Sequence, residues 1–344
     1  MIRHPMLLAV LTGDLISLLL LFAAAKTALK TIIEWAPQSA AGQQIQLERA
    51  VEAGGLSAKF VLAVFLTSTL GFIAAITNVL PAIIPGAMCG TGVLQATHGL
   101  GGPALVYRFL VLGIIYIWLI LERLNDLRPD RPLTRSNARI LLLAVPFHVL
   151  AVSTTLRAVL RIDTHQPVDC CAAVYDQFKN LAIAQQTAGI PNTLWLLIFW
   201  ILTILMVFSG LRARRATPSG RIKISSSMAL LALIWAPTAA VVLVRVFAAY
   251  YYQVPHHHCP WCLFLFEHHF VGIPLFFSLA IVVLEGPAAF ITAKIADQYP
   301  QFVQAAVRRC KIAGLRILLA TGAFIGMVSL PALFWRLQYG VWLH

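Results

Sequence analysis

The stretch "TLWLLIFWILTILMVFSGL", residues 193–211, contains no charged side chain over 19 positions. A membrane-spanning helix needs about 20 apolar residues, because each residue rises about 1.5 Å and the hydrocarbon core is about 30 Å thick. Only helices and closed barrels satisfy their backbone hydrogen bonds in lipid, and a continuous apolar run lacks the alternation of a barrel strand. This stretch therefore predicts a transmembrane helix.

Similar apolar runs recur along the whole chain of 344 residues, of which 60% are hydrophobic and 11% are charged. The first run is too long for a cleaved signal peptide, so we expect it to be retained. No internal repeat is evident in the sequence. The prediction is an all-α, polytopic membrane helix bundle that forms a single integral membrane domain over residues 1–344. Its eight expected transmembrane helices lie at about 6–29, 60–84, 104–122, 140–160, 193–211, 228–251, 263–284 and 313–335.

Basic residues are concentrated in alternate connections between the predicted spans. Segments 123–139, 212–223 and 294–316 hold five Lys and Arg each, and four more in the first connection give one side 19 of the 26 basic residues. The positive-inside rule makes this side cytoplasmic, so we expect a protein of the cell inner (cytoplasmic) membrane. The net charge of +13 then reflects topology and contact with membrane lipids, and it implies no nucleic-acid partner.

This orientation places five of the six cysteines in extracytoplasmic connections. Disulfides persist on that side of the membrane, where unused thiols tend to be oxidised or crosslinked. The placement therefore predicts thiol chemistry outside the cytoplasm. The five residues are Cys89, Cys170, Cys171, Cys259 and Cys262.

The stretch "HHHCPWCLFLFEHHF", residues 256–270, contains a Cys-x-x-Cys pair, Cys259 and Cys262, just before the predicted seventh span. At positions i and i+3 of a helix the two thiols share one face, and the positive end of the helix dipole favours thiolate. Pro260 suits a first helical turn, because its missing N–H would be unpaired there. We therefore expect a reactive thiol pair at the outer mouth of this helix.

"CPWC" at the outer start of a membrane helix resembles the quinone-linked disulfide-generating membrane proteins, the DsbB and VKOR-like group. In that group a Cys-x-x-Cys pair passes electrons to a quinone, and a second cysteine pair in another extracytoplasmic loop exchanges disulfides with a partner. The resemblance implies that Cys259 and Cys262 are the quinone-proximal pair and that Cys170 and Cys171 are the shuttle cysteines. The resemblance is local to this motif, and the chain has more predicted spans than the members of that group.

The neighbouring thiols of Cys170 and Cys171 have their own constraint. Their α-carbons are about 3.8 Å apart across a trans peptide, below the usual disulfide range of about 4.4 to 6.8 Å. A bridge between them would be strained and therefore easily reduced. Alternatively, each thiol pairs with Cys89, Cys259 or Cys262, or binds metal. Cys89 itself is either such a partner or a buried thiol in a glycine-rich connection.

Three histidines, His256, His257 and His258, precede the Cys-x-x-Cys pair. With the external thiols, Cys89 among them, they form a candidate mixed N and S site for zinc or copper. No zinc-finger spacing is present, and the histidine that covalent haem attachment requires after the pair is missing. The alternative is a solvated histidine cluster at the membrane surface.

Four further polar residues, Glu267, His268, His269 and His148, fall inside predicted spans, where ionisable groups are costly and usually face the protein interior. His148 and His268 are candidate axial ligands of haem b, although their expected depths differ by about 8 Å. Alternatively, Glu267, His268 or His269 exchanges protons with a quinone head group, with His269 two helical turns below Cys262 on the same face. In the alternative without a cofactor, these four side chains form hydrogen bonds between helices.

Three classes of function remain. We expect a membrane thiol-disulfide oxidoreductase that exchanges electrons between extracytoplasmic cysteines and a quinone, with an extracytoplasmic redox protein as partner. One alternative is a non-catalytic membrane subunit of an electron-transfer complex, which holds haem b or a metal centre beside other membrane subunits. The other is a metal transporter or metal-delivery protein, which the sequence supports least because no paired broken helices are evident.

Overall fold

The computed structural model describes residues 4–36, 42–164, 166–168, 190–254 and 257–343. Over these residues the chain is all-α and contains no strand. Eight helices within the described ranges are long and apolar enough to cross a membrane. The predicted all-α, polytopic helix bundle is therefore confirmed.

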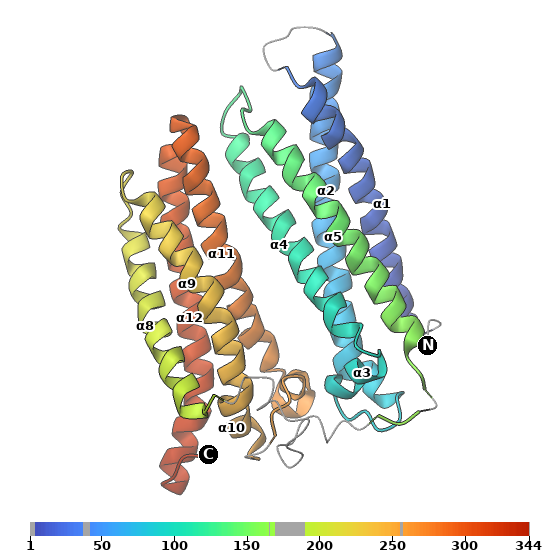
Figure 1. Cartoon of the computed structure of the whole chain (residues 1–344), viewed down its shortest axis with the longest axis vertical. Helices are drawn as coiled ribbons and strands as arrows, with labels where there is room; N and C mark the ends of the chain where they lie inside the picture. Colours follow the sequence, from blue (N-terminus) through green and yellow to red (C-terminus); the bar gives the residue numbers. More distant parts are fainter. Residues whose placement is uncertain (1–3, 37–41, 165, 169–189, 255–256, 344) are drawn as a thin grey trace. The chain divides into compact units, whose positions relative to one another are not determined.

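The chain divides into two compact units, residues 1–168 and 169–344. Each unit has four long helices of its own, which explains why each can be compact by itself (Figure 1). The helices of unit 1 are α1 (Pro5–Glu34), α2 (Gly42–Ala74), the short α3 (Gly90–Ala96), α4 (Gly101–Asn125) and α5 (Thr134–Arg161). Those of unit 2 are α8 (Asn192–Arg214), α9 (Arg221–Val242), the short α10 (Ala248–Tyr252), α11 (Gly272–Gln298) and α12 (Val303–Tyr339).

The two units share one order of elements. In each, the second long helix runs into a one-turn π-helix, Ala75–Val79 in unit 1 and Leu243–Phe247 in unit 2, before a cysteine-bearing connection. In each, consecutive long helices pack together and the fourth packs on the first, which closes a ring of four. The structure thus contains an architectural repeat that the sequence did not reveal.

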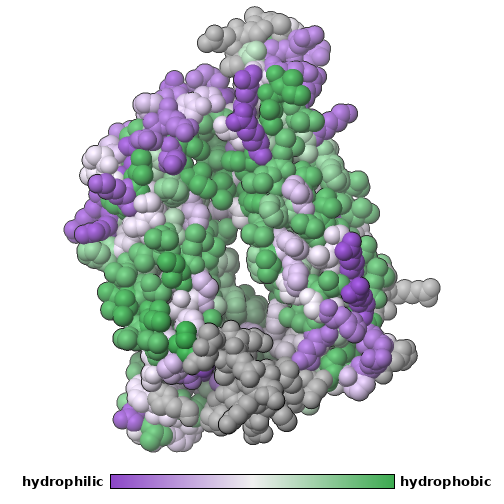
Figure 2. Space-filling view, viewed as in Figure 1, coloured by the Kyte–Doolittle hydropathy of each residue, from purple (hydrophilic) through white to green (hydrophobic). Residues whose placement is uncertain are grey.

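The surface of the helices is apolar, as a membrane protein requires. Leu19 on α1, Ile204 on α8 and Leu319 on α12 are each at least 60% exposed, which would be unfavourable in water and is favourable in lipid. Figure 2 shows hydrophobic side chains along the flanks of the helices and hydrophilic ones mainly near the helix ends. The described helices therefore present the surface of a multi-pass membrane protein.

Small residues bring helices together where lipid provides no hydrophobic driving force. A Cβ atom on Gly314 of α12 would lie 2.6 Å from the Cβ of Ala213 on α8, so only glycine permits this approach. The centre of unit 2 is then filled by aromatic rings, with Phe199 stacked on Trp235 and Phe324 edge-on to Trp235. The indole N–H of Trp235 donates to the Thr203 hydroxyl at 2.8 Å, which satisfies this buried polar group.

Candidate functional site

The Cys-x-x-Cys pair lies in the connection between α10 and α11 and not at the start of a long helix. α11 begins at Gly272, nine residues after the expected start at 263. Leu265 is extended, and His269 and Phe270 both have φ of 54°, so the backbone cannot continue as a helix here. An ionisable group such as Glu267 is costly inside lipid, which accounts for a helix that begins only after the polar residues.

The local backbone also changes the argument for reactivity. Cys262 opens a single 3-10 turn, Cys262–Phe264, and Cys259 precedes it. A turn of three residues has little dipole. The prediction that the dipole of a long helix favours thiolate at these cysteines is therefore wrong. The sulfur atoms of Cys259 and Cys262 nevertheless lie within 4.8 Å of one another, and both residues are buried. The structure therefore brings the two predicted thiols together.

An imidazole stands beside this pair. Nε2 of His257 lies 3.6 Å from Sγ of Cys262. The His257 ring packs on the ring of Tyr252 with centroids 4.4 Å apart, and Tyr252 also meets the ring of His268 edge-on at 4.7 Å. The Tyr252 hydroxyl donates to the carbonyl oxygen of Cys259. The last residue of α10 therefore holds both the imidazole and the Cys-x-x-Cys backbone in place.

The π-helix of unit 2 anchors the same connection. His258 is buried, and its Nδ1 lies 3.2 Å from the carbonyl oxygen of Val244 in the π-helix Leu243–Phe247. Because a carbonyl oxygen only accepts, Nδ1 carries a proton in this contact. Single-turn π-helices are frequent at functional sites. His258 thus fixes the connection to the π-helix.

Gly272 lets the thiol-bearing turn pack against α11. A Cβ atom at this position would lie 2.9 Å from Cδ2 of Phe264 and 3.0 Å from the carbonyl carbon of Leu263. Both distances are shorter than ordinary contacts, and the second involves backbone. The absence of a side chain at Gly272 therefore determines how closely the residues after Cys262 approach the membrane helix.

The other polar residues of this connection are more exposed than the thiols. Glu267 and His269 are exposed, and His269 lies in the connection, not two turns below Cys262 on a helix face. His268 is half-buried, and burial is the largest cause of a lowered pKa. The neighbouring His257 and His269 lower this pKa further, while Glu267 opposes them. His268 is therefore a neutral imidazole near pH 7.

The other predicted cysteines and the first histidine of the cluster lie in unit 1 or outside the described residues. Cys89 is the residue before α3 in unit 1, and Cys170, Cys171 and His256 lie outside the described residues. The N–H of Val168, two residues before Cys170, donates to the carbonyl oxygen of Pro85 at 3.0 Å. The chain at Val168 therefore lies beside the connection that carries Cys89.

His148 lies in the core of unit 1 and is fully buried on α5. Its Nε2 is engaged by the hydroxyl of Ser17 at 3.0 Å, and its ring packs on Phe65 with centroids 4.3 Å apart. His268 belongs to the connection before α11 in unit 2 and not to a membrane span. The two histidines that the sequence suggested as haem ligands thus lie in different surroundings, one inside a helix bundle and one in a connection. Their contacts give no support for a haem.

Two features escaped the sequence analysis. Tyr252 belongs to "YYY", residues 250–252, a pattern typical of an aromatic membrane anchor, yet it contacts Cys259, His257 and His268. Asp14 pairs with Arg108 at the centre of unit 1. A lone carboxylate within the apolar run 6–29 was the signal that could have indicated this second polar centre.

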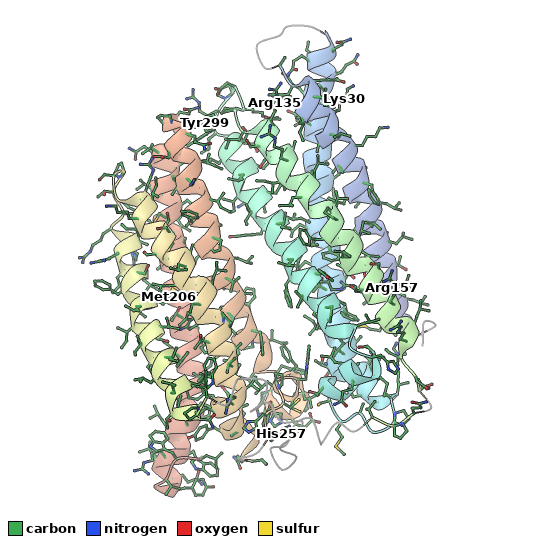
Figure 3. All side chains as sticks on the ribbon, in the orientation of Figure 1. Lys30, Arg135, Arg157, Met206, His257 and Tyr299 are labelled. Atoms are coloured by element: carbon green, nitrogen blue, oxygen red, sulfur yellow. The ribbon has the colours of Figure 1, made fainter. Side chains whose placement is uncertain are left out.

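The thiol site (Cys259, Cys262, His257 and Tyr252) combines a dithiol with an adjacent base. Figure 3 shows His257 at one end of unit 2 and Tyr299 at the opposite end. Two thiols and an imidazole also form a donor set that suits soft or borderline metals such as copper(I) or zinc. Comparison with family models, with curated proteins and with solved structures finds no match to this chain.

Proposed function

We propose that the chain is a membrane thiol-disulfide oxidoreductase with Cys259 and Cys262 as its redox pair. The observation that supports this function is the imidazole of His257, with Nε2 3.6 Å from Sγ of Cys262. A base at that position accepts the thiol proton and yields thiolate, which is the form that attacks a disulfide or an electrophilic acceptor. The sulfur of Cys259, within 4.8 Å, is the resolving thiol.

The proposed reaction is a two-electron exchange with a quinone. The thiols of Cys259 and Cys262 lose two electrons and two protons and form one S–S bond, and the quinone takes up both electrons and both protons and becomes a quinol. His257 holds the proton of Cys262 while the S–S bond forms. The disulfide then passes by thiol exchange to Cys170 and Cys171, and from them to an extracytoplasmic redox protein.

We also propose that the thiol site faces the extracytoplasmic side of the inner membrane. The connection between α8 and α9 carries Arg215 and is followed by Arg221 at the start of α9, and the connection between α11 and α12 contains Tyr299. Because α10 directly continues the span of α9, the thiol site lies at the other end of these helices, as Figure 3 illustrates with His257 and Tyr299. The positive-inside rule places the basic end in the cytoplasm, and disulfides persist on the opposite side.

The test is quinone turnover by the full chain in detergent, with a dithiol as electron donor and a water-soluble ubiquinone analogue as acceptor. We expect one quinone reduced for every two thiols oxidised, and no turnover in C259S or C262S. C310S is the matched control and should keep full turnover, because Cys310 is buried on α12 and is not part of the thiol site. Stoichiometric copper or zinc by elemental analysis, with thiols that do not cycle, would show a metal site in place of a redox pair.

A further inference from the structure

Seven polar side chains meet at the centre of unit 1, and each of its four long helices contributes at least one. All seven are buried, in a part of the bundle that lies within the membrane spans. This polar centre consists of Asp14 and Ser17 on α1, Ser68 and Thr69 on α2, Arg108 on α4, and His148 and Thr155 on α5.

An ion pair forms the middle of the polar centre. The guanidinium of Arg108 donates to Oδ2 of Asp14, and both side chains are fully buried. Nε of Arg108 donates to the hydroxyl of Thr155 at 3.1 Å, and the Ser68 hydroxyl donates to Oδ1 of Asp14 at 2.5 Å. The two charges are thus paired and hydrogen-bonded, which is the condition for burying them at tolerable cost.

The protonation of His148 follows from its neighbours. The Ser17 hydroxyl donates its only proton to the carbonyl oxygen of Asp14 at 2.9 Å. The contact of 3.0 Å between Ser17 Oγ and His148 Nε2 therefore has Nε2–H as the donor. The neutral ring is left with a lone pair on Nδ1. This atom is buried and has no hydrogen-bond partner among the described residues.

Unit 2 closes the same ring of four helices around aromatic side chains, with the hydrogen bond from Trp235 to Thr203 as a polar contact in the core. Its buried carboxylate, Glu285 on α11, pairs with Arg309 and Arg316 of α12, whose side chains are partly exposed, whereas both partners of the pair in unit 1 are fully buried. Buried ion pairs can often be replaced by apolar residues without loss of stability. Ionisable groups within the membrane therefore point to function before they point to folding.

We propose that the polar centre is a proton-binding site, in which Nδ1 of His148 takes up one proton from water. The charged groups that face the ring are Asp14 on α1 and Arg108 on α4, which pair with one another. From α2 the ring meets Phe65, while Ser68 and Thr69 contribute only hydroxyls. Protonation adds one positive charge, and Nε2–H donates to Ser17 in both states. This inference does not depend on the thiol site.

The test is nitrogen-15 NMR of the full chain in nanodiscs with labelled histidine. The His148 signals, identified by their contact with the ring of Phe65 and by their loss in H148Q, should show Nε2 protonated and Nδ1 bare at high pH. Lowering the pH should protonate Nδ1 reversibly and leave Nε2 protonated. In S17A the second neutral tautomer should appear, because Nε2–H has lost its acceptor.

Two results would overturn the proton-binding site. One is an Nδ1 that stays bare over the entire pH range in which circular dichroism shows a folded chain. The other is a neutral ring that carries its proton on Nδ1. E122Q is the matched control, because Glu122 lies 14 residues from Arg108 along α4, or about 21 Å, and should leave the His148 titration unchanged.

Discussion

R108L is expected to lower the free energy of unfolding by about 3 to 5 kcal/mol, because it leaves the carboxylate of Asp14 buried without its counter-ion. The loss also removes donors from the hydroxyls of Thr155 and Thr69. Unfolding in mixed detergent micelles, followed by circular dichroism, measures the change. Since Asp14 and Arg108 come from α1 and α4, the effect should be cooperative over unit 1.

A double-mutant cycle separates the ion pair from general packing. The D14L/R108L double variant should recover most of the lost stability, because no unpaired charge remains. The control is E52Q, which removes an ion pair with Arg131 at 3.5 Å whose carboxylate is 63% exposed. This exposed pair should contribute less than about 1 kcal/mol. Equal losses in the single and double variants would show that the charges of Asp14 and Arg108 do not interact.

H257A is expected to slow alkylation of Cys262 by about tenfold near neutral pH, since the thiol loses the base that accepts its proton. The measurement is mass spectrometry of the peptide that carries Cys262 after timed exposure of the reduced protein to iodoacetamide. The ring of His257 also packs on Tyr252, so H257F is a second variant that keeps an aromatic ring and removes the base. Both variants should show the same loss.

The matched control for this prediction is H269A. His269 belongs to the same connection, but its side chain is exposed and it contacts neither thiol in the described residues. Its alkylation rate should stay within about a factor of two of the wild type. An unchanged rate in H257A, or an equal loss in H269A, would contradict the role of His257 as the base of Cys262.

Hydropathy predicted the membrane helices well, because lipid imposes the same physical requirement on all of them. Continuous apolar length is needed wherever a helix crosses lipid, and the confirmed bundle follows from that requirement alone. Hydropathy does not locate a helix end when apolar residues continue past the membrane. The run after Cys262 is such a case, because Leu263 is buried in the core of unit 2 although the helix starts only at Gly272.

The sequence predicted the thiol site only in part. The spacing of Cys259 and Cys262 brought the two thiols to attention, and their sulfurs do lie close together. The backbone that positions them depends on residues in the left-handed region, Gln253 and His269 among them, which are not glycine and carry no clear sequence signal. The role of Tyr252 likewise depends on the tertiary fold and not on its neighbours in the chain.

The architectural repeat was invisible for a different reason. The two units keep the same helix order and the same π-helix position, but their cores use different chemistry. Asp14 and Arg108 occupy the centre of one unit, and Trp235 with its aromatic neighbours occupies that of the other. Packing geometry can be preserved while side-chain identity changes, so residue-by-residue comparison finds nothing.

The most direct test of the redox function is an equilibrium titration of the Cys259 and Cys262 pair in dithiothreitol buffers of defined potential. Acid quenching, alkylation and mass spectrometry would give the fraction of the 259–262 peptide that is two hydrogens lighter and unalkylated. The account predicts a single reversible transition of two electrons, in which the ratio of oxidised to reduced pair changes tenfold for about every 30 mV. Thiols that remain fully alkylated at every potential, or a bridge that never reduces, would contradict it.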